Sequence, residues 1–123
     1  MAEILIDTNV FTKFFLGDLA VKRFLGSVSA CTNAIVYIEL IQGSIKKQKR
    51  ELVKKYISKY PCYHLTPQIS LRAIELIDTY SSSKGLALAD ALIAATALEH
   101  DLTLATFNTK DFRFIKGLTV VEP

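Results

Sequence analysis

Short runs of β-branched and aliphatic residues alternate with longer helical segments along this chain. The β-prone runs cover residues 3–6, 29–32, 61–65, 102–106 and 119–121. The segments of helical character cover residues 9–16, 19–26, 34–44, 48–59, 67–82 and 87–100. Strands that alternate with helices in this way form a largely parallel sheet covered by helices. The sequence therefore predicts a three-layer α/β/α sandwich with a small, mainly parallel sheet.

Local signals support several of the element boundaries. Asp18 precedes an apolar segment and is expected to be an N-cap, while Pro67 suits the first turn of a helix. We expect three glycines to end helices. They are Gly17, Gly26 and Gly43. The serine-rich residues 81–85 are expected to form a flexible stretch that is too short to link domains.

Size, charge and cysteine content restrict the class of protein. At 123 residues, half of them hydrophobic, the chain is expected to form one domain over residues 1–123. The net charge of +3 is only mildly suggestive of a polyanionic partner. Cys31 and Cys62, without a secretory segment, are expected to be core thiols in a reducing cytoplasm. No apolar run approaches the roughly 18 residues of a membrane span, so we expect no membrane association.

Four acidic residues stand in apolar or strand-end settings. They are Asp7, Glu39, Asp90 and Asp111. An ionised carboxylate buried without a partner is costly, and two of them about 4 Å apart repel by roughly 4 kcal/mol at an effective dielectric constant of about 20. If the fold brings the four together, they need a cation. Oxygen ligands favour Mg²⁺ or Mn²⁺, and the chain lacks the closely spaced Cys and His of a zinc site.

Each of these acids also has an explanation that involves no chemistry. Asp7 follows a strand and can cap the next helix, and Asp90 can interact with a helix dipole in the first turn. Glu39 can pair with a distant Lys or Arg, although its neighbours at helical spacing are almost uncharged. Asp111 can belong to a turn. These alternatives remain open at the level of sequence.

The segments that carry these acids resemble the PIN-domain family, and within it the VapC-type toxins of bacterial and archaeal toxin-antitoxin modules. The resemblance extends over nearly the whole chain and depends on the order and spacing of four segments. These are Ile4-Leu5-Ile6-Asp7-Thr8-Asn9-Val10, Ile38-Glu39-Leu40-Ile41-Gln42-Gly43, Ala89-Asp90-Ala91-Leu92-Ile93-Ala94-Ala95-Thr96-Ala97 and Thr106-Phe107-Asn108-Thr109-Lys110-Asp111-Phe112. Tyr37 departs from the Ser or Thr that many relatives have before the Glu.

The resemblance implies an endoribonuclease that uses one or two Mg²⁺ or Mn²⁺ ions to hydrolyse RNA. Asp7, Glu39 and Asp90 are implied to surround the metal, and either Asn108, where family members carry Asp or Asn, or Asp111 is implied to complete the site. The resemblance also implies a cognate antitoxin laid over the site and a homodimer. Two alternatives stay open, which are an RNA-processing nuclease without an antitoxin and a non-catalytic module that binds RNA or protein.

These roles can be stated as a hypothesis. Asp7, Asp90 and Asp111 hold the metals, and Glu39 either binds metal or orients the attacking water. Neighbouring polar side chains are candidates to support these ligands because they are close in sequence. They are Thr8, Asn9 and Asn108.

Basic and aromatic clusters offer further candidate surfaces. Residues 46–60 carry seven Lys and Arg with two interleaved tyrosines, which suit either an RNA backbone or a solvated helix face. The candidate RNA-binding residues are Lys46, Lys47, Lys49 and Arg50. A second cluster repeats at helical spacing and is interpreted as core, with an antitoxin groove as the alternative. It consists of Phe11, Phe14, Phe15 and Leu16.

Overall fold

A five-stranded parallel sheet forms the centre of the protein, whose computed structural model describes residues 3–123. The strands are β1 (Glu3–Ile6), β2 (Ser29–Asn33), β3 (Cys62–Tyr63), β4 (Thr103–Ala105) and β5 (Val120–Val121). Their order in the sheet is β3-β2-β1-β4-β5, and every neighbouring pair is parallel. The first strand of the chain therefore lies in the middle, so its carboxyl end is flanked on both sides.

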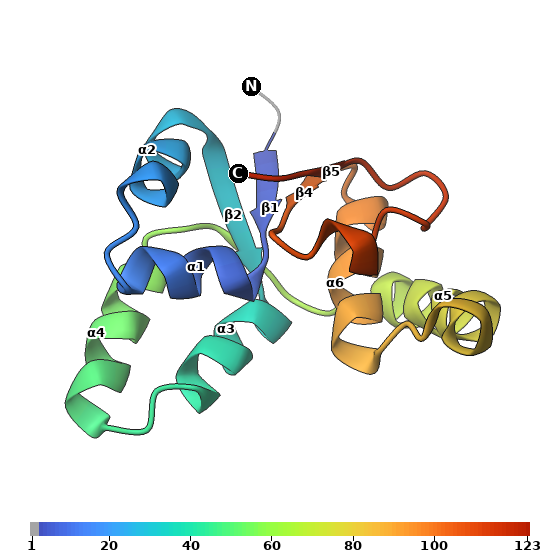
Figure 1. The fold of residues 1–123 in the computed structure, drawn as a ribbon. Helices are drawn as coiled ribbons and strands as arrows, with labels where there is room; N and C mark the ends of the chain where they lie inside the picture. Colours follow the sequence, from blue (N-terminus) through green and yellow to red (C-terminus); the bar gives the residue numbers. More distant parts are fainter. Residues whose placement is uncertain (1–2) are drawn as a thin grey trace.

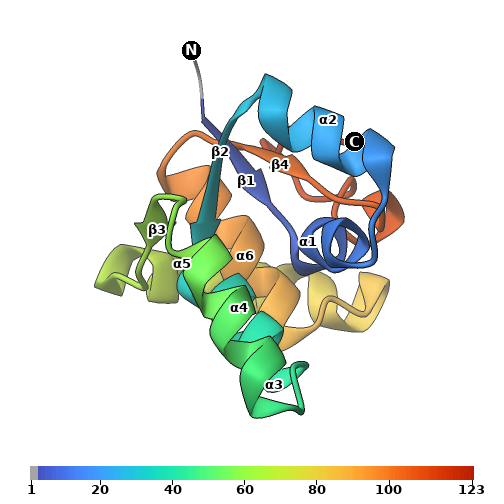
Figure 2. The same ribbon diagram turned by 90° about the vertical axis from the view of Figure 1, so that its left-hand side faces the viewer.

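Helices cover both faces of this sheet, as predicted. They are α1 (Thr8–Phe15), α2 (Leu19–Ser27), α3 (Ala34–Gln42), α4 (Lys47–Ile57), α5 (Pro67–Lys84) and α6 (Leu88–Glu99). Figure 1 shows α1 and α2 on one side of the sheet and α6 on the other, with α5 outside α6. Figure 2 shows the same layers from the side, with α3 and α4 extending beyond the edge where β1 and β2 end. The arrangement is an α/β/α sandwich.

The helix α6 owes its position to alanine. Its buried face carries Ala91, Ala94, Ala95 and Ala97, all without solvent exposure. Small side chains let a helix backbone approach its neighbours closely, and the opposite layer contributes bulky residues such as Phe11, which is also fully buried. This close approach brings the first turn of α6 near the carboxyl edge of the sheet.

Most of the predicted boundary signals are confirmed. The Asp18 carboxylate accepts from the Val21 backbone N–H at 3.2 Å, so Asp18 caps α2. Pro67 occupies the first turn of α5, after Thr66, whose hydroxyl caps that helix. Gly17 follows the end of α1 with φ of 90°, a left-handed conformation that favours glycine. Gly43 is the C-cap of α3.

Two of the boundary predictions are wrong. Gly26 does not end α2, which continues to Ser27, because a glycine is tolerated in a last turn whose position is fixed by buried Leu25. The serine-rich stretch is helical up to Lys84, and α5 ends only at Gly85, which has φ of 68°. Exposed serines cost a helix little, so the left-handed glycine rather than the serines decides where α5 stops.

The outer strands are shorter than predicted, and the cysteines are free. β3 contains only Cys62 and Tyr63 of the expected residues 61–65, because an edge strand has a neighbour on one side alone.

Cys31 is buried in β2 and Cys62 is half-buried, and neither forms a disulfide. Within residues 3–123, no helix is both long and apolar enough to span a bilayer.

Asn33 connects the sheet to two helices at the carboxyl end of β2. Its side chain is fully buried, and its amide oxygen accepts from the Val36 backbone N–H at 2.9 Å, which caps α3. Its amide nitrogen donates to the Thr96 hydroxyl of α6 at 3.1 Å. The side chain therefore fixes α3 and α6 relative to each other.

Replacing Asn33 should destabilise the whole domain. We expect Asn33→Ala to lower the free energy of unfolding by about 2 kcal/mol, because it removes a helix cap and a buried hydrogen bond together. Urea unfolding followed by circular dichroism measures this change. Gln42→Ala, at an exposed position of α3, should stay within about 0.5 kcal/mol of wild type. Equal stabilities of the two variants would contradict the role of Asn33 in holding α3 and α6 together.

Candidate functional site

The carboxyl ends of β1 and β4 bring the first acidic residue to the edge of the sheet. Asp7 follows β1 directly, and its backbone N–H donates to the Ala105 carbonyl of β4 at 3.0 Å. The side chain is only 6% exposed. In an open α/β sheet, this edge is where ligands bind. The predicted position of Asp7 at a strand end is thus confirmed.

Three hydrogen-bond donors around Asp7 fix its carboxylate. Its Oδ1 accepts from the Thr8 backbone N–H at 2.8 Å, so Asp7 is also the N-cap of α1, as the simpler interpretation predicted. Its Oδ2 accepts from the Thr106 hydroxyl at 2.7 Å and from the Asn9 amide at 3.3 Å. Capping and facing the site are therefore compatible for this residue.

Asn9 and Thr106 connect this carboxylate to the loop after β4. The Asn9 amide donates to the Thr106 hydroxyl at 3.2 Å and its oxygen accepts from the Phe107 backbone N–H at 3.1 Å. The Thr106 hydroxyl also accepts from the Asn108 backbone N–H at 3.0 Å. Asn9 was predicted to support the site, whereas Thr106 was not singled out. A Thr directly after an apolar strand, before Asn108, was the signal for it.

Glu39 reaches the same edge from the middle of α3. It is half-buried, and its Oε1 accepts from the Thr8 hydroxyl at 2.6 Å. Among residues 3–123 the ion pairs join Lys54 to Glu51 and Arg72 to Glu99, so Glu39 has no Lys or Arg partner there. The alternative in which a structural ion pair explains Glu39 is not supported. Thr8, predicted only from its proximity in sequence, contacts both Asp7 and Glu39.

Asp90 approaches from the other side, in the first turn of α6. It is half-buried, and no hydrogen bond of the described residues involves its side chain. The pKa of Asp90 is raised from 3.8 to about 6, first by burial and then by the negative charges of Asp7, Asp111 and Glu39. A helix dipole would lower this pKa, so first-turn placement alone does not describe the setting of Asp90.

Asp7, Glu39 and Asp90 line the same open depression. It is lined by Asp7, Thr8, Asn9, Thr12, Lys13, Leu16, Glu39, Asp90 and Asn108. Asp111 lies in a short 3-10 helix, Thr109–Asp111, and is exposed rather than part of this lining. Its charge nevertheless raises the pKa values of Asp7 and Asp90. The structure thus brings Asp7, Glu39 and Asp90 together and leaves Asp111 at the periphery.

Negative charge accumulates here, and none of the ion pairs within residues 3–123 includes one of these carboxylates. Burial is the main cause that raises the pKa of Asp7, the hydrogen bonds from Thr106 and Thr8 lower it, and Glu39 and Asp111 raise it. Within the part of the chain that the structure describes, no three Asp, Glu, His or Cys side chains are placed to hold one metal ion. The carboxylates therefore share a depression but do not converge on a single point.

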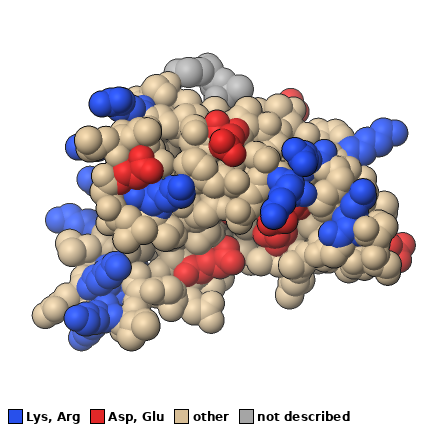
Figure 3. All heavy atoms as spheres, in the orientation of Figure 1, with Lys and Arg blue, Asp and Glu red and all other residues tan. Residues whose placement is uncertain are grey.

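The basic segment of α4 divides into residues with different surroundings. Figure 3 shows Lys and Arg atoms gathered over α4. Lys46 and Lys47 are exposed, while the Arg50 guanidinium donates to the Ser44 carbonyl at 3.2 Å and so has a structural contact. Lys49 lines a second hollow, which Thr8 and Glu39 also line. Of the four candidate RNA-binding residues, Lys49 is thus the one that shares a hollow with Glu39.

The aromatic residues of α1 mainly belong to the core. Phe11 is buried, and Phe14 stacks on Tyr56 of α4 with ring centroids 4.5 Å apart. Phe15 packs against the same tyrosine at 5.4 Å. Leu16, predicted as core with these three, is 77% exposed because it follows the last residue of α1. That part of the prediction is wrong.

Comparison with known proteins agrees with this architecture. A family model described as PIN domain matches residues 4–118. A protein named Ribonuclease VapC1 from Rickettsia felis is 30% identical over 96% of this chain and 94% of its own length. Ribonuclease VapC10 from Mycobacterium tuberculosis is 31% identical over 94% of this chain and 90% of its own.

Solved structures give the same answer at the level of the fold. A toxin-antitoxin complex from Klebsiella pneumoniae contains a chain that superposes with a TM-score of 0.83 at 31% identity, covering 98% of this chain and 97% of that one. A DNA-bound VapBC complex from Salmonella typhimurium gives a TM-score of 0.80 at 25% identity, covering 99% and 98%. With the family model extending over most of its length, the chain belongs to the PIN-domain family.

Proposed function

We propose that this chain is a divalent-metal-dependent endoribonuclease and the toxin of a toxin-antitoxin pair. One observation carries the proposal, which is that Asp7, Glu39 and Asp90 come from three separate elements and line one depression. Relatives at 30% and 31% identity are named ribonucleases. The similar Klebsiella pneumoniae chain comes from a toxin-antitoxin complex. Hydrolysis of RNA is the reaction that fits both the site and these relatives.

The chemistry of the side chains fits a hard divalent cation such as Mg²⁺ or Mn²⁺. The candidate ligands are all carboxylates, and burial together with their mutual repulsion raises the pKa of Asp90. Asp7 is held in place, whereas Asp90 is free of hydrogen bonds to the described residues. We expect rotation of Asp90 and Glu39 about their side-chain bonds to complete the coordination of one or two ions. Asp111 or Asn108 would supply the remaining contact.

Each residue of the site has a distinct part in hydrolysis. Thr106 and Asn9 keep the Asp7 oxygens in a fixed orientation. Thr8 occupies Oε1 of Glu39, which leaves Oε2 either to contact a metal ion or to accept a proton from the attacking water. The water oxygen then bonds to phosphorus as the bond to the leaving oxygen breaks. A bound divalent cation would supply charge stabilisation of the phosphate and activation of that water.

The proposed partners are RNA, a cognate antitoxin and a second copy of the chain. The depression opens to solvent beside Leu16, which is 77% exposed and offers an apolar contact for an antitoxin segment. Elsewhere, Ile38, Ile74 and Leu88 are each more than half exposed, at 56%, 62% and 72%. Burial of such side chains would favour a homodimer.

Replacing Asp90 by its uncharged isostere should remove the activity. We expect Asp90→Asn to lower kcat/KM for RNA cleavage at least about a hundredfold, because residues that merely support metal ligands already cost about 10- to 100-fold when replaced. Cleavage of a labelled single-stranded RNA with added Mg²⁺ or Mn²⁺ measures this. Wild-type cleavage should also stop when a chelator removes the metal.

A matched exchange elsewhere provides the control. Asp78→Asn, at an exposed position of α5, should cleave RNA at the wild-type rate. Undiminished cutting by wild type in chelator would refute metal dependence. Undiminished cutting by Asp90→Asn would remove Asp90 from the site.

The raised pKa of Asp90 also predicts how stability depends on pH. Between 3.8 and about 6 the folded state binds more protons at Asp90 than the unfolded state does, so this residue lowers stability as pH rises through that interval. In metal-free buffer at pH 7, Asp90→Asn should therefore be more stable than wild type. The difference should be only about 1 kcal/mol, because Asp90 is half exposed and solvent screens its charge. Urea unfolding at pH 4 and pH 7 tests this.

The two proteins should differ little at pH 4, where Asp90 is mostly protonated. Added Mn²⁺ should raise the Tm of wild type more than that of Asp90→Asn, because a ligand that binds only the folded state stabilises it. Equal stability at pH 7 without metal would show that the carboxylate is not under strain there.

A further inference from the structure

Lys13 places a positive charge at the rim of the acidic depression. It lies in the last turn of α1 and lines the depression together with Asp7, Glu39 and Asp90. Among the described residues that form this lining, Lys13 is the one with a basic side chain. A cation in such a place would be expected to pair with one of the carboxylates.

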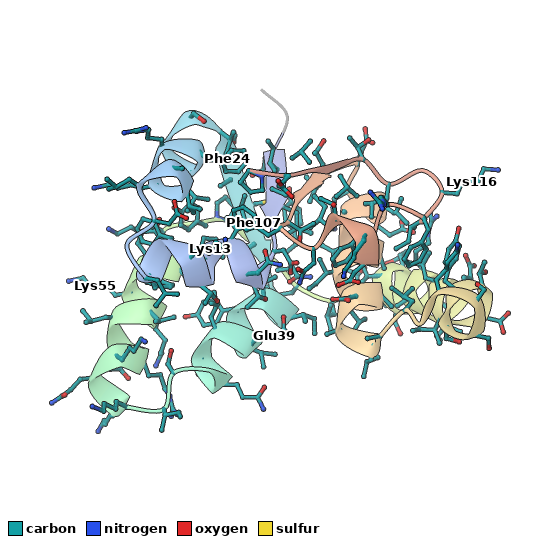
Figure 4. The ribbon with its side chains drawn as sticks, viewed as in Figure 1. Lys13, Phe24, Glu39, Lys55, Phe107 and Lys116 are labelled. Carbon is teal, nitrogen blue, oxygen red and sulfur yellow. The ribbon has the colours of Figure 1, made fainter. Side chains whose placement is uncertain are left out.

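Lys13 instead lies over an aromatic ring. Its Nζ is 4.3 Å from the centroid of the Phe107 ring, a cation-π contact, and Figure 4 shows the two side chains next to each other. Of the ion pairs within residues 3–123, none includes Lys13. The ring restricts where the ammonium group lies without using any of its three N–H donors. These donors remain available to an acceptor in the depression.

The position of Phe107 is itself linked to the acidic residues. Its backbone N–H donates to the Asn9 side chain at 3.1 Å, and Asn9 donates to the Asp7 carboxylate at 3.3 Å. The charge of Lys13 is thus placed relative to Asp7 through a short series of contacts. A flexible surface lysine would lack this connection.

We propose that Lys13, positioned over Phe107, binds a backbone phosphate of the RNA strand next to the one that is cleaved. This assignment rests on the proposed ribonuclease function and adds a substrate-binding residue to it. The carboxylates of the depression attract metal ions but repel an RNA strand, so a fixed cation at the rim offsets that repulsion where the strand enters. A lysine ammonium is a point charge with three donors and suits a phosphate oxygen.

A simpler role exists for this residue, since a lysine in the last turn of a helix interacts favourably with the helix dipole. That role predicts an effect of substitution on stability and none on RNA affinity. The two roles can therefore be separated by measuring binding directly.

Binding should be measured in the Asp90→Asn background, where the RNA stays intact. The probe is a short fluorescent single-stranded RNA of mixed sequence in Mg²⁺ buffer, and Kd is followed by anisotropy. We expect Lys13→Gln to raise Kd about fivefold and to reduce the slope of log Kd against log salt by about 0.7. Lys13→Arg, which retains the charge and the stacking on Phe107, should bind nearly as well as the parent.

Lys116→Gln is the matched control. It makes the same change in net charge at an exposed loop position that Figure 4 shows far from Lys13. Phe107→Leu keeps an apolar side chain but removes the ring, and it should raise Kd by a smaller factor than Lys13→Gln does. Equal Kd values for Lys13→Gln and Lys116→Gln would overturn the proposal.

Cleavage kinetics give the second readout, measured in protein that retains Asp90. Lys13→Gln should raise KM about fivefold and leave kcat within about twofold. A fall in kcat with unchanged KM would contradict binding at a neighbouring phosphate. Failure of the wild type to cleave any RNA would reject the proposed function, whereas the Kd comparison would still decide the role of Lys13.

Discussion

The Thr106 hydroxyl donates to Asp7 at 2.7 Å and so joins the carboxyl ends of β1 and β4 through a buried carboxylate. Because β1 is the central strand, this contact fixes Asp7 in the middle of the sheet edge, where the other acidic residues lie around it. Glu39 is oriented from the same point, since Thr8 donates its backbone N–H to the Asp7 carboxylate and its hydroxyl to Glu39. Asp90 alone arrives without such support, on a helix whose alanines let it lie close to the sheet. The site therefore combines a fixed half and a half that remains free to adjust.

This difference explains where the electrostatic cost lies. Hydrogen bonds to an ionised carboxylate favour the charged form, and those from Thr106 and Thr8 partly offset the burial of Asp7. Asp90 has burial and like charges acting on it, with nothing among the described residues to offset them. A metal site is expected to tolerate such a residue, because binding of the ion to the folded state restores the stability that the unpaired carboxylate removes. The electrostatic destabilisation is therefore largest at Asp90, the carboxylate that a bound cation would stabilise most.

How much of this could be predicted depended on whether the signal was local. The strands, the layers and the strand-end position of Asp7 follow from short sequence patterns, and the sequence predicted them. The hydroxyl of Thr106 acts across 99 positions of the chain, on Asp7, so no local pattern identifies its partner. The prediction that Leu16 is a core residue was wrong for a related reason, because helical spacing places it on the apolar face but α1 ends one residue earlier. The prediction that Gly26 ends α2 was wrong because the packing of a neighbour outweighed the low helix propensity of glycine.

The fourth position of the site shows the same limit most clearly. Sequence reasoning left Asn108 and Asp111 as alternatives, since both follow β4 within a few residues. The structure separates them by position. Both side chains are exposed, but Asn108 lines the depression and its backbone N–H donates to Thr106, whereas Asp111 lies outside the lining and acts on Asp7 and Asp90 through its charge. An amide oxygen is a neutral ligand and a carboxylate a charged one, so contact with Asn108 would leave the charge of Asp111 to act at longer range. Charge and contact can thus come from different residues, which a sequence motif cannot distinguish.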